Sequence, residues 1–297
     1  MKRCKEDVVF DAACFIILTL VLFVVAYPLY WVIISSISAP SAVSSGKVLL
    51  HPIGFTLKGY AEVFKNDQVM RGFLNSLIIT FCGVMVNLIV TLPTSYALSR
   101  SNFSGKKPIT IFYLITMFFG GGLIPTYLVI QRLQMLNTIW ALILPGCLSV
   151  YNMIVARTFF KSNISEELYE AAEIDGCTQA RFFFQIALPL SKAIIAILVL
   201  YYGVGHWNSY FSALVYISDK AKYPLQLVLR NILITNQTAL SQTATTAAAR
   251  AALQEKQQLI DVMKYSLIII SSIPVLVMYP LVQKHFVKGV MIGSMKG

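Results

Sequence analysis

Charged residues are scarce in this chain and make up only 12% of its 297 residues. Soluble globular proteins contain about 25%. Hydrophobic residues instead account for 57% of the chain, and the mean hydropathy is +0.70. A water-soluble fold of this length could not bury so much apolar surface in one core. The composition therefore predicts a protein that crosses a membrane several times.

The chain also lacks the sequence patterns of ATP hydrolysis and of metal catalysis. Ser104-Gly105-Lys106 matches the end of a phosphate-binding loop, but Arg100 stands where the first Gly of that loop is required. There is no His-Glu-x-x-His pair, and none of the 5 cysteines belongs to a Cys-x-x-Cys pair. We therefore expect this chain to have no catalytic residues and to bind no cofactor or metal ion itself.

Acidic residues are missing from the centres of the apolar runs. Asp11 stands at the start of the first run, and Asp219 and Asp261 lie outside the runs. A carrier driven by a proton or sodium gradient usually keeps carboxylates inside the membrane. Two alternatives nevertheless stay open. A self-contained secondary carrier or channel predicts intramembrane charge, and an intramembrane enzyme predicts paired catalytic residues at the depth of the spans.

Six apolar runs are each about 20 residues or longer, which is enough for a helix to cross a hydrocarbon core about 30 Å thick. They lie at 10–37, 73–99, 108–131, 139–160, 193–217 and 264–284. The predicted fold is all-α, a polytopic membrane protein in which 1–297 form a single transmembrane domain. Gly120-Gly121-Gly122 and Pro125 interrupt the third run, so we expect its outer end to be broken or re-entrant.

A polar segment at 161–192 separates the fourth and fifth runs. Good helix formers between Glu170 and Ile174 predict a short helix. Asp175-Gly176 predicts a turn, because glycine accepts a positive φ without a Cβ clash. Helix is expected to resume at Arg181, and Pro189 to mark the entry to the next run. Such a polar segment gains nothing from contact with lipid, so we expect it in water or against a partner.

A second polar segment, 218–262, has no apolar run long enough to span a membrane. It is either a helix-rich connector or a docking loop for a soluble partner. The short loop 100–107 carries three basic residues and no acid, and the positive-inside rule counts such loops. We therefore expect both termini and 161–192 in the cytoplasm, and 218–262 outside. The net charge of +11 fits anionic lipid better than nucleic acid.

The polar segment between the fourth and fifth runs resembles the EAA loop of ABC-importer permeases. The matching residues are Glu170-Ala171-Ala172, Asp175-Gly176, Phe183 and Ile186-Ala187-Leu188-Pro189-Leu190, with Cys177 where Ala is usual. Further segments resemble the maltose-type sugar permeases: Leu74-Asn75-Ser76-Leu77, Pro93-Thr94-Ser95-Tyr96-Ala97, Trp207-Asn208-Ser209-Tyr210 and the lysine-glycine ending Lys296-Gly297 of the smaller permease. Gly120 to Pro125 resembles the branch that serves oligosaccharides or polysaccharides.

This resemblance implies a type I importer permease in a bacterial plasma (inner) membrane, without catalytic activity of its own. The implied partners are a second homologous permease, two cytoplasmic ATPase subunits that bind ATP and Mg, an extracytoplasmic solute-binding protein and a carbohydrate substrate. The residues that the resemblance assigns to ATPase coupling are Glu170, Ala171, Ala172, Asp175 and Gly176.

Candidate residues for a sugar pathway offer either an aromatic face or a side-chain amide. They are Tyr113, Tyr151, Asn152, Tyr202, Trp207, Asn208 and Tyr210. Aromatic faces suit the apolar side of a sugar ring, and amides suit its hydroxyls. The alternative for each residue is a structural role, because Tyr and Trp also anchor proteins at membrane interfaces.

Overall fold

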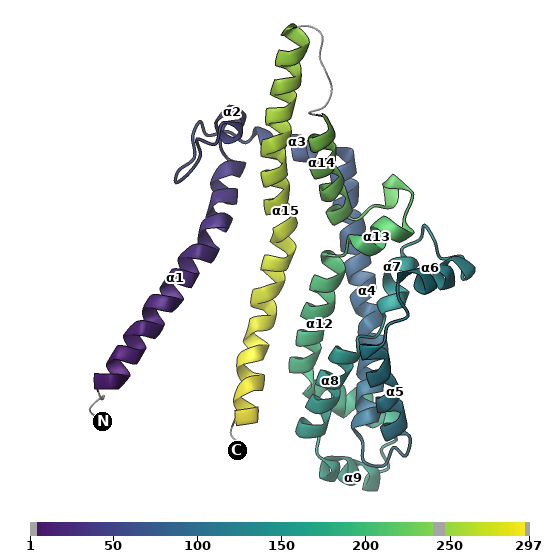
Figure 1. The fold of residues 1–297 in the computed structure, drawn as a ribbon. Helices are drawn as coiled ribbons and strands as arrows, with labels where there is room; N and C mark the ends of the chain where they lie inside the picture. Colours follow the sequence, from purple (N-terminus) through teal and green to yellow (C-terminus); the bar gives the residue numbers. More distant parts are fainter. Residues whose placement is uncertain (1–4, 240–246, 295–297) are drawn as a thin grey trace. The chain divides into compact units, whose positions relative to one another are not determined.

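The computed structural model describes residues 5–239 and 247–294. All regular elements in these two stretches are helices (Figure 1), which confirms the prediction of an all-α fold. The chain divides into two compact units, Met1–Met70 with Leu229–Ser272 and Arg71–Val228 with Ile273–Gly297. Three helices continue from one unit into the other: α4 (Asp67–Ser99), α14 (Leu225–Ala239) and α15 (Ala247–Ser294).

The first unit also contains α1 (Lys5–Ser36), α2 (Pro40–Ser44) and α3 (Lys58–Lys65). Its hydrophobic core joins α1 and α2 to α15 through Ile34, Val43 and Val262. The indole of Trp31 donates a hydrogen bond to the carbonyl of Val48 at 2.8 Å. These contacts fix the chain that follows α1 against the neighbouring helix.

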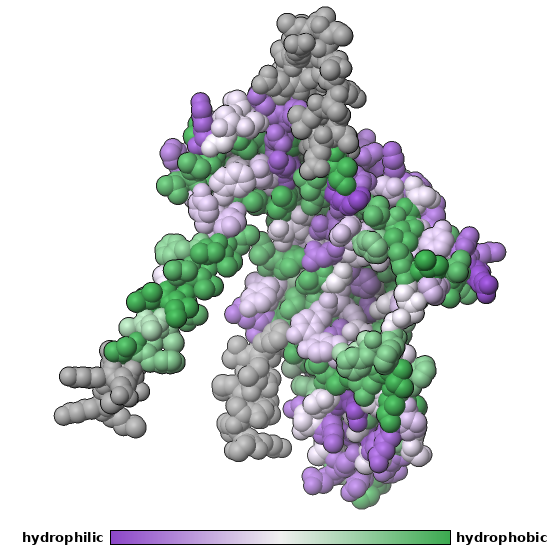
Figure 2. Space-filling model, in the orientation of Figure 1, coloured by the Kyte–Doolittle hydropathy of each residue, from purple (hydrophilic) through white to green (hydrophobic). Residues whose placement is uncertain are grey.

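The helix α1 is hydrophobic around its whole circumference. Figure 2 shows a hydrophobic surface along it, and Phe15, Leu18 and Phe23 are all exposed. A helix that is apolar on every side requires apolar surroundings. Its length and composition therefore agree with a first span, for which the sequence predicts 10–37 and the structure has Val9–Ser36.

The second unit holds most of α4 and the helices that follow it along the chain. These are α5 (Lys106–Phe118), α6 (Leu123–Arg132), α7 (Trp140–Ile143), η1 (Leu144–Gly146), α8 (Val150–Asn163), α9 (Glu166–Ile174), α10 (Gln179–Phe182), η2 (Phe183–Ala187), α11 (Leu188–Leu190), α12 (Lys192–Trp207), α13 (Phe211–Tyr216) and η3 (Lys220–Lys222). Its core joins α4, α8 and α12 to α9 and α10, and Phe160, Phe182 and Leu198 are completely buried.

Three helices in the described residues are long and apolar enough to cross a membrane, and three bent helix pairs raise the number to six if each pair is one span. One of these pairs is α5 and α6, which meet at 114°. The break contains the glycine run that precedes Pro125. The predicted interruption of the third run is therefore confirmed. The positions of the six spans in a membrane stay a prediction.

The fourth apolar run, 139–160, differs from a simple span because it breaks between η1 and α8 at an angle of 52°. Pro145 lies in η1, and Ser149 caps the start of α8. The buried side-chain amide of Asn87 donates to the carbonyls of Gly146 and Cys147 at 2.8 and 2.9 Å. These bonds replace the helical partners that the break removes, which is the condition for irregular backbone inside a membrane.

The last two runs also differ from their predicted ends. The fifth run was expected to reach residue 217, but α12 ends at Trp207 with Asn208 as its cap, and α13 follows. Asn and Ser compete for backbone hydrogen bonds, and Asn208-Ser209 therefore favours a helix end here. The sixth run belongs to a longer helix, since α15 begins at Ala247 within the second polar segment (Figure 1). The described parts of 218–262 are thus mainly helical.

Candidate coupling loop and solute groove

The predicted helix, turn and helix of the first polar segment are confirmed. In α9 the hydroxyl of Ser165 accepts a hydrogen bond from the backbone N–H of Leu168 at 3.3 Å, as an N-cap does. At the other end Gly176 has a φ of +76°, and its N–H donates to the carbonyl of Glu173 at 3.0 Å. A glycine in this left-handed conformation is a common helix stop.

The chain resumes as a helix immediately after the turn. Thr178 caps α10 through a hydrogen bond from the N–H of Arg181 at 3.3 Å. The backbone then widens into the π-helical η2, and Pro189 lies in α11. The segment from α10 to α11 meets α12 at an angle of 80°, and Ser191 lies between the two. The loop is therefore continuous with α12, so a movement of α9 and α10 can be passed to that helix.

An aromatic cluster holds the inner face of the loop. Tyr169 of α9 packs edge-on against Phe182 of α10, with ring centroids 5.2 Å apart. Tyr96 of α4 packs against Phe160 of α8 and Phe183 at 5.6 and 5.0 Å. All five rings are buried. Because they come from helices on both sides of the turn, they fix the loop to the helical core.

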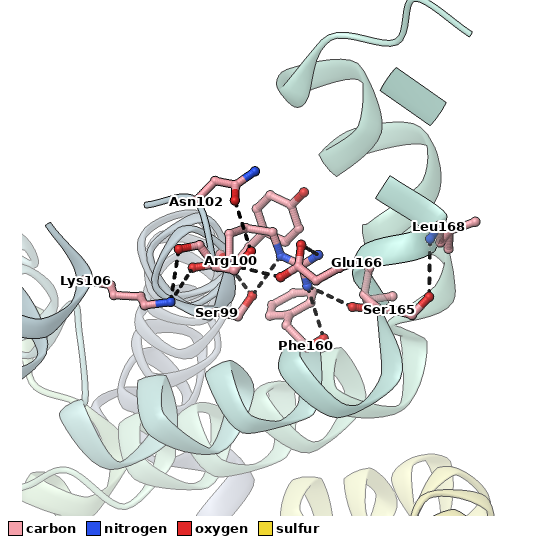
Figure 3. Close-up of polar contacts among 11 residues, drawn as sticks. Ser99, Arg100, Asn102, Lys106, Phe160, Ser165, Glu166 and Leu168 are labelled. Carbon is pink, nitrogen blue, oxygen red and sulfur yellow. Dashed lines mark hydrogen bonds and ion pairs between the residues drawn. The ribbon is translucent and has the colours of Figure 1, made fainter. Parts of the chain in front are cut away.

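Arg100, at the end of α4, joins three helices by polar contacts (Figure 3). Its Nη2 donates to the carbonyl oxygens of Ile164 and Phe160 at 3.0 and 3.4 Å, at the end of α8. Its Nη1 lies 3.8 Å from the carboxylate of Glu166 in the first turn of α9. The same carboxylate accepts a hydrogen bond from the N–H of Ser101 at 3.1 Å. Cations at helix C-termini and an acid at a helix N-terminus are each stabilising.

A cavity of about 350 Å³ adjoins these contacts. Arg100, Tyr96, Glu166, Tyr169 and Phe183 contribute to its walls. The hydroxyl of Tyr96 and the Nη1 of Arg100 are buried without a hydrogen-bond partner. Nη1 of Arg100 forms an ion pair with the carboxylate of Glu166, but the distance of 3.8 Å is too long for a hydrogen bond. The contacts on this side of α9 are therefore not all fully satisfied.

The outer face of the loop is exposed. Of the residues expected to couple the chain to an ATPase, Glu170, Ala171, Asp175 and Gly176 are exposed and Ala172 is half-buried. Ile174, which the sequence reasoning did not select, is 87% exposed. Figure 2 shows the hydrophilic surface around α9 next to the hydrophobic surface of α5. A partner protein that covered this face would bury the Ile174 side chain, which removes apolar surface from water.

Two candidate pathway residues lie in the core of the second unit. Tyr202 is 7% exposed; its hydroxyl lies 2.7 Å from the hydroxyl of Thr91 and accepts from the N–H of Ser149 at 3.2 Å. Trp207 is buried against Phe73 with ring centroids 5.6 Å apart. In this conformation both side chains hold helices together.

Two other candidates line one open groove of about 540 Å³. Tyr151 and Asn152 lie in the first turn of α8. Tyr201 of α12 and Tyr279 of α15 complete the polar part of the wall. The remaining candidates are elsewhere on the unit: Tyr113 lies in α5, Asn208 caps α12 and Tyr210 follows it. The sequence reasoning missed both Tyr201 and Tyr279. Their only signal was a tyrosine in an apolar helix, which many other positions share.

No family model matches the chain. It is 36% identical over 288 residues to the polygalacturonan/rhamnogalacturonan transport system permease protein YtcP of Bacillus subtilis (strain 168), a match that covers 97% of this chain and 98% of YtcP. It is 38% identical over 297 residues to the protein LplC of the same strain, covering 100% of this chain and 98% of LplC.

A solved structure has the same fold. It is a crystal structure of a bacterial ABC transporter involved in the import of the acidic polysaccharide alginate. One of its chains superimposes on this one with a TM-score of 0.86 at 27% identity, over 96% of this chain and 99% of that chain. Sequence and fold similarity therefore both extend over nearly the whole length.

Proposed function

This chain belongs to the family of sugar ABC-transporter permeases. We propose that it imports oligosaccharides or polysaccharide fragments in a complex with three kinds of partner protein. It pairs with a second, homologous permease. Two cytoplasmic ATPase subunits bind ATP and Mg and supply the work. An extracytoplasmic solute-binding protein delivers the sugar. Both termini and the EAA loop are cytoplasmic, in a bacterial inner membrane.

The observation that carries the coupling part of this proposal is the two-sided construction of α9. Its inner face is packed through Tyr169 and held by the contacts of Arg100 with Glu166. Its outer face leaves Glu170 and Ile174 without cover from this chain. A helix that is fixed on one side and exposed on the other can receive a force from a partner and pass it to the core. Glu170 is suited to meet a basic residue of the ATPase.

The substrate class is inferred from the relatives. YtcP is named as a permease protein for the transport of polygalacturonan and rhamnogalacturonan. The transporter in the solved structure is involved in the import of alginate, another acidic polysaccharide. A third relative, 29% identical, is described for galactooligosaccharides, which are neutral. We therefore include both acidic and neutral oligosaccharides among the substrates to be tested.

Reconstitution tests this function directly. The chain alone in proteoliposomes is expected to show neither ATP hydrolysis nor sugar flux. The complex, isolated from cells through an affinity tag on this chain, is expected to show both when the binding protein is loaded with trigalacturonate or galactotriose. The switch between two permease states needs several kcal/mol of differential binding, and the ATPases are its source here. Concentrative uptake by the lone chain under a proton or sodium gradient would establish the secondary-carrier alternative instead.

A further inference from the structure

Two buried polar atoms near the end of α4 have no hydrogen-bond partner in the part of the chain that the structure describes. They are the hydroxyl of Tyr96 and the Nη1 of Arg100. The guanidinium of Arg100 lies over the Tyr96 ring, with Cζ 5.1 Å from the ring centroid, and Tyr96 is only 8% exposed. A buried polar group without a hydrogen bond is costly, and most such groups are paired. Both residues line the cavity of about 350 Å³, so the two donors indicate an occupant that accepts hydrogen bonds.

The charges around these two donors favour an anion. Nη1 of Arg100 lies 3.8 Å from the carboxylate of Glu166, which is the acidic residue of the wall (Figure 3). Two further cations flank it. Lys106 donates to the carbonyl oxygen of Arg100 at 3.3 Å, and Arg181 directly follows the wall residue Ala180. Three cations against one carboxylate give this end of the cavity a net positive charge. A phosphate group suits such a place, because an arginine N–H and a phosphate oxygen form a charge-assisted hydrogen bond.

Much of the remaining wall is apolar and extends along α4 away from Arg100. Pro93 and Ala97 line the cavity from α4, and Phe103 and Phe184 line it from the neighbouring segments. Residues three and four positions apart lie on one face of a helix, so Pro93, Ala97 and Arg100 form a line along α4. This line is about 10 Å long at the rise of an α-helix. A charged end that continues into an apolar strip matches an amphiphile with an anionic head and an alkyl chain.

We propose that this cavity binds an anionic phospholipid of the cytoplasmic leaflet. The phosphate accepts hydrogen bonds from Nη1 of Arg100 and from the hydroxyl of Tyr96, and part of one acyl chain lies along Pro93 and Ala97. The inference rests on the proposed function, whose topology places the end of α4 at the cytoplasmic surface. A soluble anion satisfies the two donors equally well, but it leaves the apolar wall in contact with water, which is unfavourable.

A lipid in this cavity contacts both helices of the EAA loop as well as α4. Glu166 and Tyr169 line the cavity from α9, Gln179 lines it from α10 and Phe183 from η2. A ligand that contacts all of these elements stabilises the arrangement in which they are packed together. We therefore expect anionic lipid to hold the loop against α4, so that a force on α9 is transmitted to the core and the coupled ATP hydrolysis of the complex rises.

Quenching by brominated lipid measures this binding directly. A fluorophore on Ile89→Cys, in the full-length chain without its native cysteines, lies one helical turn beyond Pro93 on the same face of α4, and this position is exposed. In phosphatidylcholine nanodiscs, brominated phosphatidylglycerol should quench it more than an equal fraction of brominated phosphatidylcholine, because choline adds a positive charge to the headgroup. The excess should correspond to about a fivefold local enrichment, the factor that one nearby basic residue gives. The same fluorophore on Phe81→Cys, another exposed position of α4, is the control and should be quenched equally by both lipids.

A substitution then links the enrichment to this cavity. Tyr96→Phe removes the unpartnered hydroxyl and keeps the ring, so the fold should be unaffected. It should raise the mole fraction of phosphatidylglycerol needed for half-maximal quenching at position 89 by about threefold to tenfold, the loss of one hydrogen bond. Tyr127→Phe is the matched control, because this half-buried tyrosine of α6 packs against Tyr216 outside the cavity. In the tagged complex, Tyr96→Phe but not the control should shift the phosphatidylglycerol dependence of the ATP hydrolysis that a loaded binding protein stimulates.

Other results would overturn the assignment. Equal quenching by the two lipids at position 89, or an unshifted midpoint in Tyr96→Phe, shows that this cavity does not select an anionic lipid. If inorganic phosphate replaces phosphatidylglycerol in supporting ATP hydrolysis, the ligand is a soluble anion and not a lipid. If the chain binds phosphatidylglycerol but the activity of the complex does not depend on it, the ATPase covers the cavity and the lipid has no role in coupling. The quenching measurement does not involve transport, so a wild-type complex that imports no sugar contradicts the proposed function alone.

Discussion

At the residue scale, Gly176 and Arg100 do different work at the same loop. Gly176 supplies a backbone conformation, and nothing lies within 4 Å of the position that a Cβ would occupy there. Arg100 supplies side-chain contacts, and its side chain is only 11% exposed. The first residue sets the direction in which the chain leaves α9, and the second ties the start of α9 to the ends of α4 and α8. Substitutions of Gly176 and Arg100 should therefore have different effects, the first on coupling and the second on stability.

Gly176→Ala is expected to impair coupling without an internal clash. A left-handed conformation costs a residue with a Cβ about 1–2 kcal/mol, so the turn shifts or is less populated. The ATP hydrolysis that a loaded binding protein stimulates in the whole complex should fall by about fivefold to thirtyfold if this free energy is lost from the coupled state. Gly205→Ala is the matched control, because its φ is ordinary and a Cβ there also meets nothing within 4 Å. Equal activity in both variants would contradict the role of the turn.

Arg100→Gln is expected to destabilise the junction of α4, α8 and α9. Hydrogen bonds from a charged group are worth about 1.5–3 kcal/mol. Their loss removes the Arg100 donor from the carbonyl of Ile164, whereas the carbonyl of Phe160 still accepts from the N–H of Ile164. Arg100→Lys should recover only part, since an ammonium cannot reach both carbonyls and Glu166 at once. Thermal unfolding of the purified chain in detergent measures the loss. Lys65→Gln, which breaks the exposed ion pair with Glu62 at 3.3 Å, should change stability by less than about 1 kcal/mol.

At the element scale, α9 is a helix with one face for the core and the other for a partner. Its inner residue Tyr169 is buried, while Glu170 and Ile174 lie on the exposed side one helical turn apart. A substitution on the exposed face removes nothing from the core of this chain. The consequences should therefore appear in assembly with the ATPases and not in folding.

Ile174→Ser should weaken the complex with the ATPase subunits by roughly tenfold to a hundredfold, because burying this side chain at an interface is worth about 1.5–3 kcal/mol. Glu170→Lys should have a similar effect by reversing the charge of a charge-assisted contact. Both variants should reach the membrane and unfold at the wild-type temperature. Co-purification of the ATPase with the tagged chain is the measurement. Full recovery of the ATPase with both variants would show that the partner contacts another surface.

At the scale of the whole molecule, the proposed topology puts the two polar segments on opposite sides of the membrane. A labelling test of the second polar segment at Ser241 or Thr245 falls outside the described residues. Asp219 offers a described and exposed alternative next to η3, and Glu173 represents the opposite side at the EAA loop.

Labelling of intact spheroplasts should therefore separate two single-cysteine variants. Asp219→Cys is expected to react with a membrane-impermeant thiol reagent, and Glu173→Cys to react only after the membrane is made permeable. The reason is the cluster of basic residues in the short loop 100–107, which the positive-inside rule places in the cytoplasm. The reverse labelling pattern would invert the whole topology.

The sequence by itself determined features whose physical causes are local. Composition alone requires an apolar environment, since too few polar residues exist to cover a soluble fold. The break after Gly120-Gly121-Gly122 and the turn at Asp175-Gly176 follow from backbone preferences that act over a few residues. The spacing of the EAA loop carried the family resemblance, which the relatives later confirmed.

Only the tertiary structure decided which side chains meet. Arg100 and Glu166 are far apart in the sequence, and no local pattern pairs them. Tyr201 and Tyr202 are neighbours in an apolar helix, where the sequence favours neither one for the pathway. They point about 100° apart around the helix axis. Tyr202 therefore meets Thr91 in the core, and Tyr201 lines the groove with Tyr279. The orientation of α12 is set by packing over long sequence distances, and a helix apolar on every side does not encode that orientation in its own residues.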